Sequence, residues 1–264
     1  MNLNTSGGGN KVKVGAVSYL NTKPLVFGFE KGMMKDEVEL TYDYPGKIAQ
    51  SLLNGTIDVG LVPVSIIPEM KEHHLLADYC IAADGPVASV CLFSEVPLQE
   101  ITTVLLDYQS RTSVLLVQYL LKEYWQQAPV FKKAGVDFIN EIKDTTAAVV
   151  IGDRAFKQRK ISPYIYDLGE AWKNHTGLPF VFAAWVSNKA LPADFITSFN
   201  AANEYGLQRL EEVISENPCN DFDLTKYYTH HIQYRLDDVK RSGLQKFLAW
   251  CRHLKESRQP NGVL

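Results

Sequence analysis

The sequence is poor in several features that mark large classes of protein. Its 264 residues hold four cysteines, and none forms a CxxC pair. We therefore expect reduced thiols rather than a disulfide framework or a zinc site. No stretch of 18 uninterrupted apolar residues occurs, and residues 1–10 are polar and Gly-rich without an apolar signal-peptide core. This pattern predicts a cytoplasmic chain with a flexible tail over residues 1–10 and no membrane partner.

The sequence also has no large excess of basic over acidic residues, or of acidic over basic ones. The chain has 27 basic and 30 acidic residues, a net charge of −3 and no long basic tract, so no nucleic-acid partner is expected. His73-His74 and His230-His231 are adjacent pairs, which cannot share a helical face as paired metal ligands do, so no metal is expected. The G-x-S-x-G and P-loop motifs are absent, and no G-x-G-x-x-G motif follows the first strand.

What is present is an alternation of short apolar runs and helix-like segments, which is typical of α/β proteins. The strands that we expect lie at 12–17, 38–42, 58–62, 75–81, 87–93, 102–106, 147–151, 164–166 and 180–186. The expected helices follow the turn after the first strand and lie at 45–54, 114–124, 168–174, 195–214, 224–228 and 236–254. The pattern after Pro192 is thus helical to the end.

This order predicts two α/β lobes with a cleft between them. Lobe 1 is expected to combine residues 11–90 and 186–264, and lobe 2 to span residues 91–185, with crossings near 87–93 and 182–186. Ligands of open α/β sheets bind at the carboxyl ends of the strands, which would face this cleft. A single doubly wound sheet is the alternative.

The turn after the first strand, Ser18-Tyr19-Leu20-Asn21-Thr22-Lys23-Pro24, is crowded with hydrogen-bonding groups. Thr22 or Asn21 can cap the following helix, and Pro24 suits its first turn. Backbone amides beside Ser18 and Asn21 would then favour a carboxylate or a phosphate. The alternative is an ordinary helix cap with no ligand.

A second turn of the same kind is Ser110-Arg111-Thr112-Ser113, which also lies between a strand and a helix. Ser110 or Thr112 can cap, and the amides together with the Arg111 guanidinium can hold a carboxylate. The alternative is a capped helix with an arginine that faces solvent. Two such turns, one in each lobe, favour a ligand with anionic groups at both ends.

Weaker candidates lie at other strand ends. Ser89 is expected on a crossing strand, Ser65 after Pro63, and Gly152-Asp153 after a strand, where an acid can be a base, a hydroxyl acceptor or a cap. The late aromatic residues, among them Tyr227, Tyr228 and Tyr234, are interpreted as packing for the terminal helices.

The segment 14–25 closely resembles the opening of the chorismate dehydratases of the futalosine route to menaquinone. Further matching motifs, in the same order as in that family, are 54–55, 58–65, 85–90, 110–113, 151–153, 166–169 and 176–183. The resemblance implies a two-lobed, periplasmic-binding-protein-like (type II) α/β fold with a central cleft and a helical C-terminal region. It also implies loss of water from chorismate to give 3-[(1-carboxyvinyl)oxy]benzoate, without a cofactor. The chain is expected to act as a monomer or homodimer.

The same resemblance implies roles for individual residues. Asn21 and Ser18 would line the wall of the first lobe, with Asn21 the catalytic amide. The substrate-binding residues would be Ser89, Ser110, Arg111, Thr112, Ser113, Gly152 and Ser65. No His or Glu base accompanies the motifs, so the substrate's own enolpyruvyl carboxylate is the expected proton acceptor, with Asp153 as the alternative.

Two rival functions stay open at this point. The lyase of the same pathway that forms 1,4-dihydroxy-6-naphthoate shares the fold but tends to open with a Ser-Pro-Cys-Pro-Asn-type turn, whereas this chain has Ser18-Tyr19-Leu20-Asn21-Thr22. A non-catalytic solute-binding protein for an anionic metabolite would normally carry an export signal, which residues 1–10 do not resemble.

Overall fold

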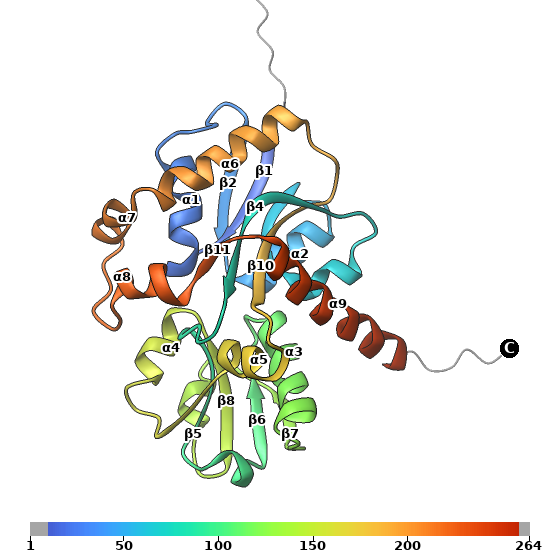
Figure 1. Ribbon diagram of the computed structural model, residues 1–264, viewed down its shortest axis with the longest axis vertical. Coiled ribbons are helices and arrows are strands. Elements are labelled where there is room, and N and C mark those ends of the chain that lie inside the picture. Colours follow the sequence, from blue (N-terminus) through green and yellow to red (C-terminus); the bar gives the residue numbers. More distant parts are fainter. Residues whose placement is uncertain (1–9, 259–264) are drawn as a thin grey trace, which may run out of the picture.

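The computed structural model describes residues 10–258, so all but the last residue of the expected tail 1–10 lies outside the described residues. Two β-sheets with helices around them make up this part of the chain (Figure 1). The six-stranded sheet has the order β11-β4-β10-β3-β1-β2, and the five-stranded sheet has the order β7-β6-β8-β5-β9. The expected two-lobed α/β fold is confirmed, and the alternative of one continuous sheet is wrong.

The strands largely match the expected ranges. They are β1 (Val12–Val17), β2 (Val38–Asp43), β3 (Val59–Pro63), β4 (His74–Ala83), β5 (Val90–Ser94), β6 (Thr103–Leu106), β7 (Val130–Lys133), β8 (Thr146–Ile151), β9 (Tyr164–Asp167), β10 (Phe180–Ser187) and β11 (Gln233–Arg235). Sequence analysis missed β7, an exposed edge strand that ends in two lysines, and β11, which has only three residues. Neither has the apolar run of a buried strand.

The helices follow the expected order with two exceptions: a short helix after β8 was not expected, and the expected helix 195–214 is divided into two helices. They are α1 (Lys23–Glu30), α2 (Pro45–Leu53), α3 (Thr112–Tyr119), α4 (Asp153–Gln158), α5 (Leu168–Thr176), α6 (Ala193–Leu207), α7 (Leu210–Glu216), α8 (Leu224–Lys226) and α9 (Asp238–Arg258). Proline occupies the first turn of both α1 and α2, where its missing N–H costs nothing. Gly177 ends α5 in the left-handed conformation at φ 74°.

Each sheet combines parallel and antiparallel pairs. In the first sheet β1 pairs in parallel with β2 and β3, while β10 runs antiparallel to β3 and β4. In the second sheet β6 is parallel to β7 and β8, while β5 is antiparallel to β8 and β9. The chain passes between the lobes after β4 and again between α5 and β10. The expected lobe boundary at residue 186 therefore falls inside β10, whose pairing within the first sheet begins at Phe180.

The last helix, α9, packs against both lobes at their junction (Figure 1). Its Trp250 meets Tyr119 of α3 edge-on, with ring centroids 5.3 Å apart. One turn earlier, Phe247 contacts Phe180 of β10 at 4.9 Å and Trp172 of α5 at 6.0 Å. Such aromatic pairs contribute about 0.5–1.5 kcal/mol each beyond their buried area. They hold α3, α5 and the start of β10 against one common helix.

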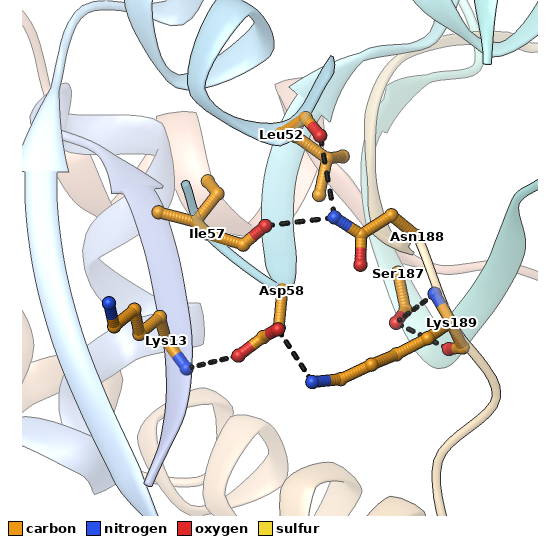
Figure 2. Close-up of polar contacts among 7 residues, drawn as sticks. All are labelled: Lys13, Leu52, Ile57, Asp58, Ser187, Asn188 and Lys189. Carbon is orange, nitrogen blue, oxygen red and sulfur yellow. Dashed lines mark hydrogen bonds and ion pairs between the residues drawn. The ribbon is translucent and has the colours of Figure 1, made fainter. Parts of the chain in front are cut away.

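Polar contacts fix the edge of the first sheet that lies where β1 and β3 begin (Figure 2). The Asp58 carboxylate accepts from the Lys13 backbone N–H at 2.9 Å and from the Lys189 ammonium at 2.6 Å. The Asn188 amide donates to the carbonyls of Leu52 at 3.4 Å and Ile57 at 3.0 Å. These bonds tie α2, β1, β3 and the chain after β10 together, so the opposite ends of the strands lie at fixed positions.

The helices α1 and α6 approach closely because each contributes a glycine at the contact. A Cβ added at Gly206 would lie 2.1 Å from the Pro24 carbonyl oxygen and 2.7 Å from the Phe27 Cβ. A Cβ added at Gly28 would lie 2.3 Å from the Ala202 carbonyl oxygen. The position of α1, which begins in the turn that sequence analysis singled out, thus depends on α6.

We expect Gly206→Ala to lower the free energy of unfolding by about 1–3 kcal/mol, the usual cost of overpacking, because backbone must move to admit the methyl group. Urea unfolding measures this. Glu204→Ala, at an exposed position of the same helix, is the control and should stay within about 0.5 kcal/mol of the parent chain. Equal stability of the two variants would contradict the close-packing argument.

Candidate active site

A cavity lies between the two lobes and takes its walls from both sheets. Its apolar lining consists of Val17, Pro45, Pro63, Ile81, Val90, Ile151, Phe182 and Ala183. Its polar lining consists of Tyr19, Asn21, Ser110, Thr112 and Ser113, with Gly152 beside them. The cavity therefore has an apolar body and hydroxyl, amide and phenol groups on its walls.

The lining follows from the direction of the parallel strands. Val17 ends β1, Pro63 ends β3 and Ile151 ends β8, while Ser110 lies in the turn after β6. Parallel strands of one sheet end at a common edge, and the edges of the two sheets meet at this cavity. Asn21 of the first turn and Ser110, Thr112 and Ser113 of the second therefore reach the same cavity.

The turn after β1 departs from the expected helix cap. Leu20–Thr22 forms a 3-10 turn, so Thr22 already has helical dihedral angles and no side chain caps α1. The Thr22 hydroxyl instead lies 3.3 Å from the Asn21 Oδ1. Asn21 lines the cavity, whereas Ser18 is exposed and does not contribute to the lining.

One of the backbone amides beside Asn21, which were expected to favour a ligand anion, already has an anionic partner. Leu20 N–H donates to the two carboxylate oxygens of Asp153, at 3.1 and 3.4 Å. Burial raises the pKa of the Asp153 carboxyl above its usual value, and the Leu20 amide offsets part of this rise. Asp153 is the first residue of α4, in the other lobe, and lies outside the cavity lining. The contact thus joins the lobes at the cavity wall.

The start of α3 matches the expected cap. The Ser110 Oγ accepts from the Ser113 N–H at 3.1 Å. The Thr112 hydroxyl accepts from the Ser65 N–H at 3.2 Å and donates to the Ser65 Oγ at 3.3 Å, which places Ser65 behind the cavity wall. Ser110, Thr112 and Ser113 are buried and line the cavity.

Arg111, by contrast, points away from the cavity. Its guanidinium donates to Glu69 at 3.3 Å and to the side chain of Gln50 at 3.2 Å, both in the first lobe. The side chain is 32% exposed, so this ion pair contributes little stability. Arg111 thus joins the lobes outside the cavity, and the expected guanidinium is not on its wall.

Ser89 lies directly behind the lining. It is fully buried, its Oγ accepts from the Tyr227 hydroxyl at 2.6 Å, and its carbonyl accepts from the Gly152 N–H at 2.9 Å. Gly152 has φ 65°, and a Cβ there would lie 2.9 Å from the Tyr19 ring. Both facts require glycine at this position of the cavity wall.

Sequence analysis interpreted Tyr227, Tyr228 and Tyr234 as packing residues. Their hydroxyl groups also form hydrogen bonds. Tyr228 donates its hydroxyl to the Leu20 carbonyl, and Tyr234 donates to the Asn21 carbonyl, each at 3.0 Å. All are buried, as is Tyr227, and burial raises their phenol pKa values, which keeps the hydroxyls protonated as donors. The C-terminal region therefore holds the turn that carries Asn21.

Two residues that sequence analysis did not single out bridge the lobes over the cavity. The Tyr19 hydroxyl donates to the Gln109 Oε1, and the Gln109 carbonyl accepts from the Gly46 N–H at 3.1 Å. A half-buried ion pair supports Gln109, because the buried Asp107 accepts its backbone N–H at 3.0 Å and binds Arg154 at 2.6 Å. No sequence motif predicts the hydrogen bond between Tyr19 and Gln109, because these residues lie far apart in the sequence.

Other sites are not evident in residues 10–258. No group of three or more His, Cys, Asp or Glu side chains there is arranged to hold a metal ion. None of the helices in this range combines the length and apolar character needed to cross a membrane.

Comparison with known structures supports the fold. A protein of Archaeoglobus fulgidus superimposes with a TM-score of 0.74 at 13% identity, covering 94% of this chain and 98% of that one. The periplasmic aliphatic sulphonate binding protein of Escherichia coli does so with a TM-score of 0.63 at 12% identity, covering 94% and 88%. At such identities the likeness concerns the fold alone, and it is the periplasmic-binding-protein-like fold that was expected.

Sequence comparison is more specific. The chain is 28% identical to a chorismate dehydratase of Thermus thermophilus, covering 89% of this chain and 93% of that one. It is 26% identical to a chorismate dehydratase of Campylobacter jejuni, covering 91% and 97%. Residues 12–253 match the model of a family described as menaquinone biosynthesis. The chain therefore belongs to the menaquinone biosynthesis family.

Proposed function

We propose that this chain is a chorismate dehydratase, which removes water from chorismate to give 3-[(1-carboxyvinyl)oxy]benzoate for menaquinone synthesis through futalosine. The observation that carries the proposal is the cavity between the lobes, where an apolar body meets Asn21 on one side and the start of α3 on the other. The family and the two dehydratase relatives support it. A cytoplasmic location and a monomer or homodimer remain part of the proposal.

The cavity suits a cyclic dicarboxylate. Apolar strand residues such as Ile81, Val90 and Phe182 provide contact area for the six-membered ring. The Ser110 and Ser113 hydroxyls, at the start of α3, provide donors for one carboxylate. The Asn21 side chain, on the other lobe, can donate to the second carboxylate or to the ring hydroxyl.

The reaction needs a proton acceptor and help for the leaving hydroxyl. The ring C3–H bond breaks, its electron pair forms the new ring double bond, and the C4 hydroxyl leaves with a proton as water. Aromatisation provides much of the driving force, so the protein's part is to orient the substrate and stabilise charge. We propose that the Asn21 side-chain amide donates a hydrogen bond to the departing hydroxyl. Because an amide cannot serve as an ordinary base, Asn21 is not the proton acceptor.

The proton acceptor that we propose is the substrate's own enolpyruvyl carboxylate. The alternative, Asp153, accepts a hydrogen bond from the Leu20 amide and lies outside the lining. No histidine or glutamate lines the cavity. These contacts favour a substrate-assisted elimination.

Closure of the cavity serves this chemistry. The bonds from Tyr19 and Gly46 to Gln109 keep the lobes together over the cavity. Less bulk water at the cavity would strengthen the few hydrogen bonds that orient the substrate.

Incubation of the purified protein with chorismate tests the proposal. We expect an aromatic product that is lighter than chorismate by the mass of one water molecule, followed by mass spectrometry and ultraviolet absorbance. Asn21→Ala should lower kcat/KM by about a hundredfold, as loss of one charge-stabilising donor does. Chorismate binding without product would favour a solute-binding protein, and neither binding nor product would remove chorismate as the ligand.

Asp153→Asn distinguishes the two proton acceptors. We expect kcat close to that of the parent chain, because the asparagine Oδ1 can still accept from Leu20. Since folding raises the pKa of Asp153, its charge costs stability at neutral pH, and the parent chain regains that stability as the pH falls through the raised pKa. The variant should therefore be at least as stable at pH 7 and lose this advantage on acidification. A collapse of kcat with unchanged stability would identify Asp153 as the base.

Gln109→Ala tests the closing contact. The variant keeps the backbone carbonyl that Gly46 uses, yet loses the acceptor for Tyr19. We expect hydrogen exchange at the Leu20 and Gly46 amides to quicken by about three- to tenfold, because one hydrogen bond contributes about 0.5–1.5 kcal/mol. Gln118→Ala removes a bond to Val114 within α3 and is the control. Identical exchange in both variants would show that Gln109 does not hold the lobes together.

A further inference from the structure

The Asp167 side chain binds two separate segments of backbone. Its Oδ1 accepts from the N–H groups of Gly169 at 3.0 Å and Glu170 at 3.2 Å, which caps α5. The same carboxylate accepts from Val87 N–H at 3.0 Å through Oδ1 and from Ala88 N–H at 2.8 Å through Oδ2. Asp167 is 8% exposed. A helix cap needs only the first pair, so the second pair calls for a separate explanation.

The second pair belongs to the first crossing between the lobes, where the backbone is strained. Ala88 has φ 64°, in the left-handed region that non-glycine residues rarely adopt, and it is buried. Ser89 N–H donates to the Val87 carbonyl at 2.8 Å, which closes a γ-turn around Ala88. A γ-turn with positive φ at its centre is rare and strained, and such turns persist only where their surroundings hold them.

The turn at Ala88 sets the direction of the chain that enters the cavity wall. The next residue, Ser89, meets the Tyr227 hydroxyl through its Oγ and the Gly152 N–H through its carbonyl. Val90 after it lines the cavity, as does Gly152. An Ala88 that relaxed to negative φ would redirect Ser89 and break both contacts.

We propose that Asp167 is a positioning residue for the dehydration: by binding the Val87 and Ala88 amides it holds Ala88 in the left-handed conformation that places Ser89 and Val90 at the cavity wall. Asp167 lies outside the cavity lining and acts through Ala88 and Ser89. Its effect on turnover rests on the proposed function, whereas the effect on the turn does not.

Asp167→Asn separates the two tasks of this side chain. Asparagine caps helices as well as aspartate does, so its single oxygen can serve α5. Its NH₂ group cannot accept the Ala88 N–H that Oδ2 now binds. Ala88→Gly provides the rescue, because glycine adopts positive φ without strain and needs no partner to hold it there.

We expect Asp167→Asn to lower kcat with chorismate by about tenfold, equivalent to about 1.4 kcal/mol of transition-state stabilisation. Adding Ala88→Gly should restore most of the lost rate, and Ala88→Gly alone should keep it. Asp237→Asn is the control, since Asp237 caps the start of α9 by accepting from Lys240 N–H at 2.9 Å and lies away from the turn. It should leave kcat unchanged.

Hydrogen exchange at the Ser89 and Gly152 amides reports the turn itself. Protection should fall in Asp167→Asn and return in the double variant. An unchanged kcat and unchanged protection in Asp167→Asn would overturn the proposal, and so would a loss that Ala88→Gly fails to repair, because Asp167 would then be only a cap. If the parent chain does not convert chorismate, the proposed function fails, and exchange alone decides the role of Asp167.

Discussion

The candidate site depends on one geometric constraint, which is that parallel strands in a sheet end at a common edge. In the first sheet β1 and β3 end there, in the second β6 and β8, and each is followed by a polar turn or a helix start. Because helix starts present unpaired amides, both edges offer donors to whatever lies between them. The antiparallel strands β4, β5 and β10 add Ile81, Val90, Phe182 and Ala183 to the apolar lining of the same cavity. A site with an apolar middle and polar walls therefore follows from the sheet topology.

Several polar groups that the sequence suggests as ligand-binding groups instead form hydrogen bonds or ion pairs between the two lobes. The Leu20 amide binds the Asp153 carboxylate, and the Arg111 guanidinium binds Glu69. Buried donors and acceptors must be paired, so closing the lobes leads the protein's own groups to satisfy one another. What stays on the cavity wall is Asn21 and the start of α3. The chemistry proposed for the cavity therefore relies on amide, hydroxyl and backbone donors, and leaves proton removal to the substrate.

Local pattern predicted most of the elements, because buried strands carry apolar runs and helix starts carry caps and prolines. It failed where an element has no such pattern, as in the exposed edge strand β7 and the short β11. It also failed at Thr22, where a 3-10 turn precedes α1 and removes the geometry of a cap. The resemblance to a known family added residue roles such as that of Asn21, which no pattern of charge or spacing could provide.

By itself the sequence determined the α/β order, the polar turns at the strand ends and the family, since these are encoded in short stretches of neighbouring residues. Only the tertiary structure decided which of the polar groups face the cavity and which face each other. Asp153 and Arg111 form hydrogen bonds between the lobes instead of facing the cavity. Gln109 accepts a hydrogen bond from Tyr19 of the other lobe, and Asp167 accepts one from the backbone of the strained Ala88. The physical reason is that a hydrogen bond between distant residues depends on where folding places both partners, which the chemical character of either residue does not specify.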